Sequence, residues 1–177
     1  MRIVGGILKG RIFRPNKSFK SRPTTDIAKE GLFNILENRY EFSNKKILDI
    51  FSGTGSIGYE FVSRGCLEAI LVENNFAHYR FILSVLDALK IKNAKAFKAD
   101  AFKFIKKYNG QFDIIFADPP FDLKTLNEIP DAIFQSDILT ETGLFILEHP
   151  KEFDFSKHEK FRDIRKYGKV NFSFFEH

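Results

Sequence analysis

Five short apolar runs along this chain constrain its fold more than any other feature. They cover residues 46–51, 69–73, 94–99, 112–117 and 144–148, of which 94–99 is the weakest, and segments with helical spacing follow the first three runs. Continuous apolar strands separated by helices indicate a parallel sheet that is covered on both faces. The aromatic-rich tail, residues 161–175, predicts two more strands at an antiparallel edge. The expected architecture is therefore α/β, with a seven-stranded and mostly parallel sheet.

Basic residues gather at the start of the chain. Residues 1–25 hold seven of the 28 basic side chains and no acidic one, which leaves 21 basic and 23 acidic residues in the rest. The net charge of +5 thus comes entirely from this arm, and such asymmetry favours a polyanionic partner, with a merely solvated tail as the alternative. Gly5-Gly6 and Lys9-Gly10 punctuate two short apolar-polar alternations, which predicts a small basic hairpin. Thr24 or Thr25 is expected to cap a helix that runs to about Tyr40.

The length and composition suit a single domain over residues 1–177, with the arm of residues 1–25 inside it. The sequence contains no run of 18 apolar residues, so no membrane span is predicted. The first residues lack the apolar core of a signal peptide. One cysteine, Cys66, cannot form an internal disulfide, and the chain has no cysteine cluster for a zinc site. We therefore expect a cytoplasmic, monomeric protein without a metal.

Four expected strands end at an acidic residue: Asp49, Glu73, Asp100 and Asp118. In a parallel α/β sheet, ligands bind beyond the carboxyl ends of the strands, so these side chains are expected to line one site. Each acid taken alone could equally be a loop-capping residue. Four acids at successive ends of one sheet favour a ligand site.

A glycine-rich turn follows the first of these acids, and its sequence is Phe51-Ser52-Gly53-Thr54-Gly55-Ser56-Ile57-Gly58. The pattern G-x-G-x-x-G also fits a dinucleotide site, and an NAD-dependent oxidoreductase is one alternative. Asp49 is an awkward neighbour for a diphosphate but a suitable one for an ammonium or sulfonium group. Glu73 suits the hydroxyls of a ribose, and Asp100 suits the amine of adenine. Together these preferences describe S-adenosylmethionine (SAM) rather than NAD.

The fourth acid opens the tetrapeptide Asp118-Pro119-Pro120-Phe121. Two consecutive prolines lack amide hydrogens and stiffen the loop, and Pro119 favours an extended Asp118. The loop offers a carboxylate, free carbonyls and an aromatic face, which suit a flat ring that carries an amine. A plain turn with an incidental aspartate is the alternative.

These motifs together resemble those of the class I, Rossmann-like, SAM-dependent N-methyltransferases. More specific segments are similar to the RsmD family, which methylates the exocyclic N2 of a guanine in small-subunit (16S) ribosomal RNA. They are Arg2-Ile3-Val4-Gly5-Gly6, Lys9-Gly10-Arg11, Arg22-Pro23-Thr24-Thr25-Asp26 and Glu30-Gly31-Leu32-Phe33-Asn34. The resemblance extends from residue 2 to Tyr167-Gly168. The chain departs from the family pattern at Phe121, where many relatives have tyrosine, and at Asn74-Asn75.

The resemblance implies roles for three sets of residues. SAM would be bound by Asp49, Phe51, Ser52, Gly53, Thr54, Gly55, Glu73, Asn74, Asp100, Ala101 and Phe102. The target base would be held by Asp118, Pro119, Pro120 and Phe121. Ribosomal RNA, free or in the small ribosomal subunit, would meet Arg2, Lys9, Arg11, Arg14, Lys17 and Arg22, and Arg22 with Thr24 would shape the lid of the pocket.

Other functions remain open from the sequence. The same tetrapeptide serves DNA adenine-N6 and protein glutamine-N5 methyltransferases, although the chain has no room for a separate DNA-recognition domain. A non-catalytic RNA-binding assembly factor with a relic pocket is a further alternative. His149, beside Pro150, is expected to be a structural loop residue rather than a base.

Overall fold

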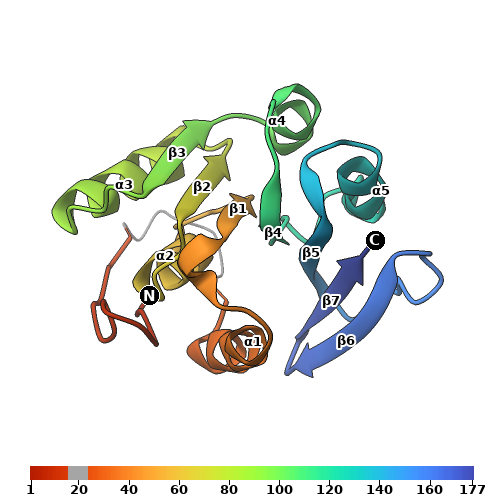
Figure 1. Ribbon diagram of the computed structural model, residues 1–177, viewed down its shortest axis with the longest axis horizontal. Coiled ribbons are helices and arrows are strands. Elements are labelled where there is room, and N and C mark those ends of the chain that lie inside the picture. The colour runs from red at the N-terminus through yellow and green to blue at the C-terminus, as the bar shows by residue number, and fades with distance from the viewer. Residues whose placement is uncertain (16–23) are drawn as a thin grey trace.

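A seven-stranded sheet organises the computed structural model, which describes residues 1–15 and 24–177 (Figure 1). The strands are β1 (Lys46–Ile50), β2 (Glu68–Glu73), β3 (Ala94–Lys98), β4 (Phe112–Ala117), β5 (Leu139–Pro150), β6 (Phe161–Tyr167) and β7 (Val170–Glu176). Their spatial order is β3-β2-β1-β4-β5-β7-β6, in which the first five strands are parallel and β7 pairs antiparallel with both β5 and β6. This arrangement confirms the predicted α/β sheet with its antiparallel edge.

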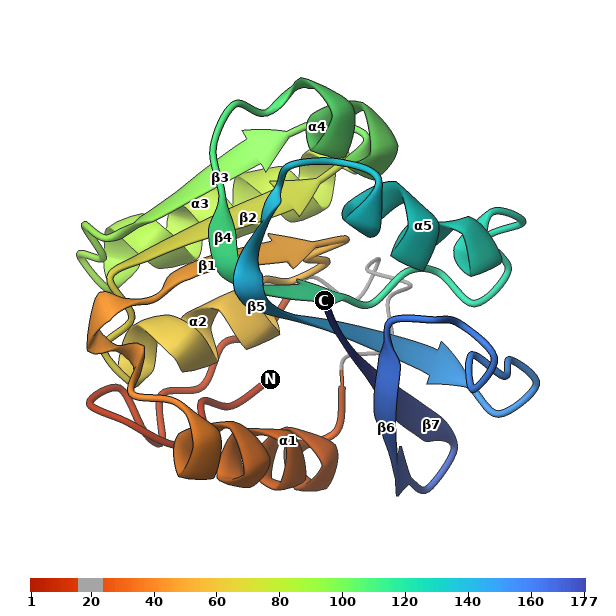
Figure 2. The same cartoon turned by 45° about the vertical axis from the view of Figure 1, so that its right-hand side comes forward.

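Helices cover both faces of the sheet. The α-helices are α1 (Asp26–Arg39), α2 (Ser56–Ser63), α3 (Phe76–Ala88), α4 (Ala101–Lys107) and α5 (Ile129–Phe134), and the short 3₁₀ turns are η1 (Phe42–Asn44) and η2 (Leu126–Glu128). One apolar core joins the sheet to α1, α2 and α3, and a second core joins it to α4 and α5. Figure 2 shows α4 and α5 on one side of the sheet, with α1 and α2 on the other.

Strand alternation explains how one sheet feeds two cores. Side chains of successive residues point to opposite faces, so Ile47 packs toward α1–α3 while its neighbour Leu48 packs toward α4 and α5. The chain runs outward from β1 to β3 and then returns to place β4 on the other side of β1. The order of the strands therefore reverses between β1 and β4, the position at which open α/β sheets bind ligands.

The N-terminal hairpin is present but minimal. Its only regular pairing among the described residues is one antiparallel bridge between Arg2 and Ile12. Hydrogen bonds from the Ile3 amide to the Arg11 carbonyl (3.0 Å) and from the Gly10 amide to the Ile3 carbonyl (2.9 Å) flank that bridge. Thr25 caps α1, since its side chain accepts a hydrogen bond from the Ala28 amide. Both predictions for this part of the chain are confirmed.

Two elements differ from the sequence prediction. The strand expected at residues 144–148 is longer and spans Leu139–Pro150, and the prediction contained no helix corresponding to α5. The helix has only six residues and no side-chain cap, so its pattern is too short to show a helical period. Pro130 in its first turn was the available signal.

Candidate functional site

The acidic residues at the strand ends lie on one face of the sheet. Asp49, Glu73, Asp118 and Glu148 have the same parity along their strands as Ile47, Leu71, Phe116 and Ile146, which all pack in the core beneath α1–α3. β1 pairs with both β2 and β4, and β4 pairs with β5, so the carboxyl ends of these four strands are adjacent. Three of the four expected acids, Asp49, Glu73 and Asp118, therefore end adjacent strands, and they are joined by Glu148, which was not predicted to take part.

Asp49 is the most deeply placed of these acids. It is 2% exposed, and its Oδ2 accepts a 3.0 Å hydrogen bond from the Gly58 amide in the first turn of α2. Burial raises the pKa of Asp49 from 3.8 to about 8, the Gly58 amide lowers it, and the nearby Glu73 raises it further. An isolated carboxylate is costly in this position, and a bound cation would offset that cost.

The glycine-rich loop turns tightly to begin α2. Gly55 has φ of +79°, and a Cβ there would lie 2.6 Å from the Tyr59 hydroxyl oxygen. A Cβ on Gly58 would lie 2.7 Å from Leu71 on β2, so glycine is required where helix and sheet approach most closely. Phe51 adopts φ of +61°, a conformation that costs a non-glycine residue about 1 kcal/mol or more. The loop therefore holds strain where ligand binding is expected.

The other residues of the glycine-rich loop make contacts inside the protein. The Ser52 hydroxyl donates to the Asp49 carbonyl (2.6 Å), and Thr54 Oγ1 lies 3.3 Å from Met1 Sδ, so both side chains are engaged inside the protein. Glu73 Oε2 accepts from the Gly53 amide (2.8 Å), and this bond fixes the loop against β2.

The residues expected around an adenine ring follow β2 and β3. Asn74 is exposed, Ala101 is buried and Phe102 is half-buried. Asp100 caps α4, since its Oδ1 accepts a 3.0 Å hydrogen bond from the Lys103 amide. Asp100 is therefore a capping residue, which was the alternative to a role in ligand binding. Its second oxygen, Oδ2, is still available to a ligand.

The tetrapeptide after β4 forms an open loop. Asp118 is half-buried, Pro119 is buried, and Phe121 keeps 43% of its surface exposed. The Pro120 carbonyl accepts from the Leu123 amide at 2.9 Å, whereas the Pro119 carbonyl accepts no hydrogen bond from the described residues. Burial of its carboxyl raises the pKa of Asp118 well above its usual range, and Glu148 and Asp49 raise it further. A carboxyl, a free carbonyl and an exposed ring thus occur together, as the sequence predicted.

Glu148 is the site residue that sequence reasoning missed. Its side chain is 3% exposed, and its Oε2 accepts a 2.7 Å hydrogen bond from the hydroxyl of Thr24, which is also buried. Ala117 pairs with Leu147, so Asp118 and Glu148 are the next residues along two adjacent parallel strands. Burial raises the pKa of Glu148 to about 7, against the Thr24 hydrogen bond that lowers it. The available signal was its position as the last residue of an expected strand.

His149 lies within β5 rather than in a loop, and it faces the opposite side of the sheet from Glu148. Its Nε2 lies 2.7 Å from Ser173 Oγ on β7, and its Nδ1 lies 2.9 Å from the Pro150 carbonyl oxygen. Burial lowers the pKa of this imidazole. The expected structural role fits these contacts, while the expected loop position was wrong.

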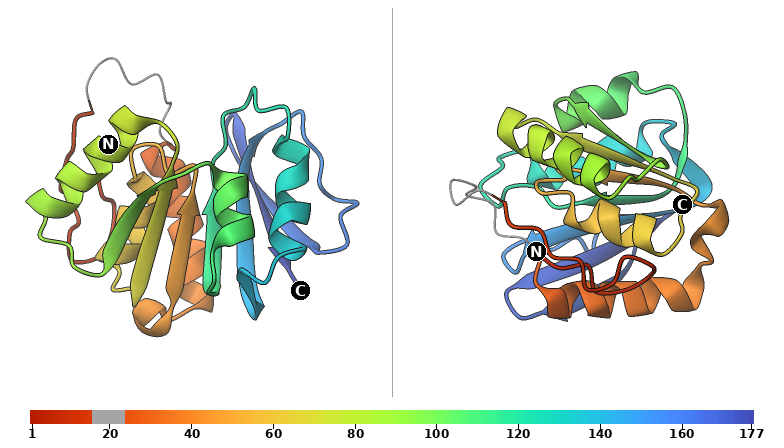
Figure 3. Two further views of the ribbon diagram at one scale, coloured as in Figure 1. Left: turned by 90° about the horizontal axis from the view of Figure 1, so that it is seen from above. Right: turned by 90° about the vertical axis from the view of Figure 1, so that its left-hand side faces the viewer.

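Residues 1–15 of the basic arm lie against α1 and α2, as the right panel of Figure 3 shows. Arg2 pairs with Asp26 at 3.1 Å, while Lys9, Arg11 and Arg14 are exposed. The contact of Met1 with Thr54 brings the start of the chain beside the glycine-rich loop. Lys17 and Arg22 fall outside the described residues, and so does the predicted lid contact of Arg22.

A buried ionic cluster holds this arm in place. Lys29 is 1% exposed and Glu60 is 0% exposed, and the Lys29 Nζ to Glu60 Oε1 distance is 3.2 Å. Glu60 Oε1 also accepts a 2.8 Å hydrogen bond from the Val4 amide, and Lys29 Nζ donates to the Arg2 carbonyl. Arg64 pairs with the second oxygen of Glu60. Residues 1–15 of the arm are therefore part of the folded structure.

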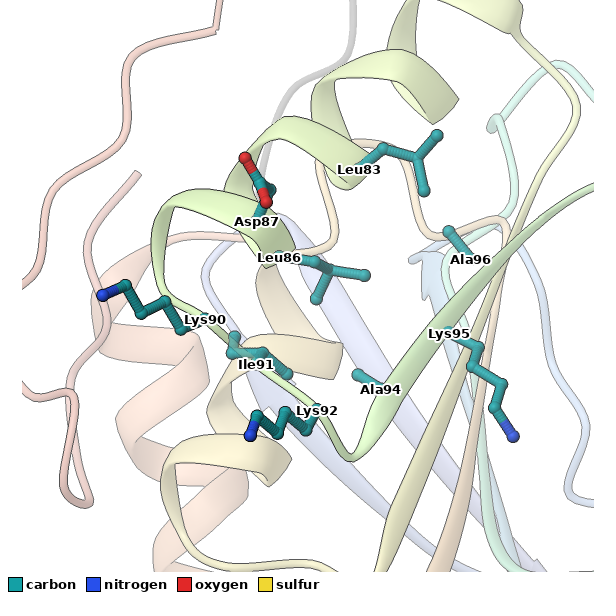
Figure 4. Close-up of a pocket in the computed structure, with 9 residues that line it drawn as sticks. All are labelled: Leu83, Leu86, Asp87, Lys90, Ile91, Lys92, Ala94, Lys95 and Ala96. Atoms are coloured by element: carbon teal, nitrogen blue, oxygen red, sulfur yellow. The ribbon is translucent and has the colours of Figure 1, made fainter.

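A separate groove lies at the open edge of the sheet, between the end of α3 and β3 (Figure 4). Leu83, Leu86 and Ala94 form part of its lining, together with Lys90 and Lys92. None of the strand-end acids lines it, so the groove is distinct from the candidate site.

Comparison with known proteins agrees with this geometry. A family model described as "Conserved hypothetical protein 95" matches residues 1–176. The chain is 33% identical over 159 residues to "Putative rRNA methyltransferase YlbH" of Bacillus subtilis, covering 87% of this chain and 85% of that protein. It is 32% identical over 152 residues to "Ribosomal RNA small subunit methyltransferase D" of Escherichia coli K12, covering 86% and 76%. The solved structure "Putative methyltransferase yhhF from Escherichia coli" superposes with a TM-score of 0.88 at 28% identity, covering 100% and 97%.

The sheet, the glycine-rich loop and the strand-end acids define a protein of the Rossmann-like methyltransferase class. Within that class, the chain belongs to the RsmD family of ribosomal RNA methyltransferases. Among residues 1–15 and 24–177, no helix is both long and apolar enough to cross a membrane.

Proposed function

We propose that this protein transfers a methyl group from SAM to the exocyclic N2 of a guanine in small-subunit ribosomal RNA. The observation that carries the proposal is the loop Asp118-Pro119-Pro120-Phe121, which follows β4 at the strand reversal, beside the buried Asp49. Membership of the RsmD family, with a relative named as a small-subunit methyltransferase, supports RNA as the substrate.

The residues around the glycine-rich loop fit SAM. Ser56 Oγ is buried at the start of α2 and has no hydrogen-bond partner among the described residues, and Gly55 supplies no side-chain cap. This helix end suits a carboxylate, because unsatisfied amides and the helix dipole favour an anion. Asp49 suits a positively charged ammonium or sulfonium, and Glu73 suits ribose hydroxyls. Bound SAM supplies a methyl group on a sulfonium, which is already an excellent leaving group.

The loop after β4 would align the nucleophile. The lone pair of guanine N2 is delocalised into the ring, so orientation is the main contribution that side chains can make. Asp118 and the free Pro119 carbonyl would each accept a hydrogen bond from the exocyclic amine. These two bonds would direct the lone pair of the nitrogen at the methyl carbon. The methyl group would pass to nitrogen as its bond to sulfur breaks, with the electrons going to sulfur, and the nitrogen would then lose one proton to solvent. The same two acceptors stabilise the positive charge that develops on nitrogen.

Phe121 would stack on the guanine after the base leaves its RNA stack. Its 43% exposure leaves a ring face open beside Asp118. Phenylalanine retains the stacking surface of the tyrosine found in many relatives, and it lacks the hydroxyl.

Replacement of Asp118 by alanine tests this assignment. We expect methyl transfer from labelled SAM to small-subunit RNA to fall by at least about a hundredfold, while calorimetry shows nearly unchanged SAM binding. Asp122→Ala removes an exposed carboxylate four residues later and is the matched control. Full transfer by the Asp118 variant would refute its role.

The target base needs a separate measurement. Mass spectrometry of nucleosides in RNA from a deletion strain should show the loss of one N2-methylguanosine, and the purified protein should restore it. Methylation of DNA adenine or of a protein glutamine, with the RNA unchanged, would replace the proposed substrate.

A further inference from the structure

A second basic segment covers the open edge of the sheet. Residues 90–107 contain seven lysines and one acidic residue, Asp100, so this short stretch carries a net charge of +6. The lysines, all exposed, are Lys90, Lys92, Lys95, Lys98, Lys103, Lys106 and Lys107. With the N-terminal arm, they leave 14 basic and 22 acidic residues in the rest of the chain. The acidic excess in the rest of residues 26–177 cancels the charge of this segment when the net charge is summed over that whole range.

These lysines extend from the candidate site along the edge of the sheet. β3 is the outermost strand, and α4 follows its carboxyl end directly. Lys98 and Lys103 bracket the residues expected near adenine. Lys90 and Lys92 lie at the far end of β3, where they line the groove of Figure 4.

Protection of a sheet edge explains only part of this pattern. Lysines on an edge strand discourage pairing with another chain, which accounts for Lys95 and Lys98 on β3. Lys103, Lys106 and Lys107 lie on a helix, where there is no edge to protect. Lys95 pairs with Glu68 at 2.8 Å, but none of the three α4 lysines forms an ion pair within the part of the chain that the structure describes. Their positive charge is therefore available to a partner.

We infer that the exposed lysines of α4, continued along the sheet edge by those of β3, form a second surface for the RNA phosphate backbone, with α4 on the opposite face of the sheet from the N-terminal arm. The inference rests on the proposed function, since it takes the RNA substrate as the polyanion. The arm packs with α1 and α2 on one face, and α4 covers the other face. The strand ends between them carry carboxyl groups, which do not attract a polyanion. Positive surfaces on both sides of the strand ends offset the repulsion between these carboxyl groups and phosphate. They would hold the RNA across the site.

The triple variant Lys103→Gln/Lys106→Gln/Lys107→Gln tests this surface. Glutamine is a good helix former, and these side chains point away from the buried residues of α4, so the fold should persist. We expect the slope of log affinity for small-subunit RNA against log salt to become shallower by about 2, and Kd to rise roughly tenfold or more near 0.15 M salt. Calorimetry should show unchanged SAM binding.

The matched control removes the same charge from the opposite edge. Lys157, Lys166 and Lys169 are exposed around β6, the last strand on that side. Their triple glutamine variant should keep the salt slope of the unmodified protein. An equal loss in both triple variants would show a net-charge effect and overturn the assignment of a surface.

Three further outcomes would also overturn the inference. If the α4 variant keeps the salt slope while the unmodified protein methylates the RNA, the second surface is refuted and the proposed function stands. Absence of both RNA binding and methyl transfer in the unmodified protein defeats the proposed function first, and the surface with it. If the α4 variant loses binding to anionic phospholipid vesicles and keeps full RNA affinity, the lysines serve a membrane surface instead.

Discussion

The hydroxyl of Thr24 donates a 2.7 Å hydrogen bond to Oε2 of Glu148, although 124 positions separate them in the sequence. Thr24 lies just before the cap of α1, and Glu148 lies beside Asp118 at the ends of two adjacent strands. Burial raises the pKa of Glu148 to about 7 despite this hydrogen bond. A carboxyl that titrates near neutral pH therefore lies next to the one proposed to hold the guanine amine.

Glu148→Gln should shift the pH profile of methyl transfer. Glutamine removes the negative charge that helps to raise the pKa of Asp118, while its amide oxygen can still accept the Thr24 hydroxyl. The pKa of Asp118 should therefore fall. Asp118 must be ionised to accept hydrogen bonds from the guanine amine. The acidic limb of kcat should therefore move to lower pH when measured with saturating SAM and RNA.

The control for this variant is Glu152→Gln, which neutralises an exposed glutamate four residues further on. Its profile should match that of the unmodified protein. If Glu148→Gln lowers kcat equally at every pH and leaves the acidic limb in place, Glu148 has only a structural role.

Asp49→Asn should stabilise the unliganded protein and impair SAM binding. Folding raises the pKa of Asp49 from 3.8 to about 8, so its carboxyl ionises more readily in the unfolded chain. The folded state therefore loses stability as the pH rises through this range. Asparagine avoids this cost and can still accept the Gly58 amide, so at pH 8 the free energy of unfolding should increase by about 1 kcal/mol or more. Chemical denaturation at pH 5 and pH 8 measures the difference, which should be larger at pH 8.

The same raised pKa predicts pH-dependent cofactor binding. A cation beside Asp49 requires the ionised form, so binding should release a proton below pH 8, and affinity should rise as pH approaches about 8. Calorimetry in buffers of different ionisation enthalpy measures the proton count. Zero proton release at pH 7 by the unmodified protein would contradict the placement of Asp49 against a cationic group.

Glu60→Gln should destabilise the fold and loosen the arm. It leaves Lys29, which is 1% exposed, without its buried counter-charge and weakens the hold on the Val4 amide. Removal of one partner from a buried pair costs roughly 3–5 kcal/mol. Thermal unfolding and proteolysis near residues 1–15 report the two effects.

Glu37→Gln is the matched control, because Glu37 pairs with Arg64 at 2.8 Å but is 47% exposed. It should change stability by no more than about 1 kcal/mol. An equally small effect of Glu60→Gln would show that the buried cluster does not anchor the arm.

Neutralisation of the arm should weaken RNA binding without altering the fold. Lys9, Arg11 and Arg14 are exposed, and their replacement by glutamine should make the log–log salt slope shallower by about 2. SAM binding should persist, since none of the three contacts the strand-end acids. An unchanged salt slope would exclude these residues from the RNA interface.

Local patterns explain which parts of the site could be predicted. The acids Asp49, Glu73 and Asp118 lie at or next to the ends of apolar runs, and strand parity places them on one face once the runs pair in parallel. The double proline predicted a stiff loop because its constraint is within the loop itself. By contrast, the positive φ of Phe51 could not be predicted, since surrounding contacts impose it against the preference of the residue.

The sequence alone determined the parallel sheet, the helix that follows Thr24-Thr25, and the stiff loop that begins at Asp118, because short-range periodicity and turn chemistry specify them. Only the tertiary structure showed that Thr24 binds Glu148, that Lys29 is buried against Glu60, and that the lysines of α4 lie on the face opposite the arm. These relationships join residues far apart in the chain. Burial and charge pairing there depend on how whole elements pack, which no local pattern encodes.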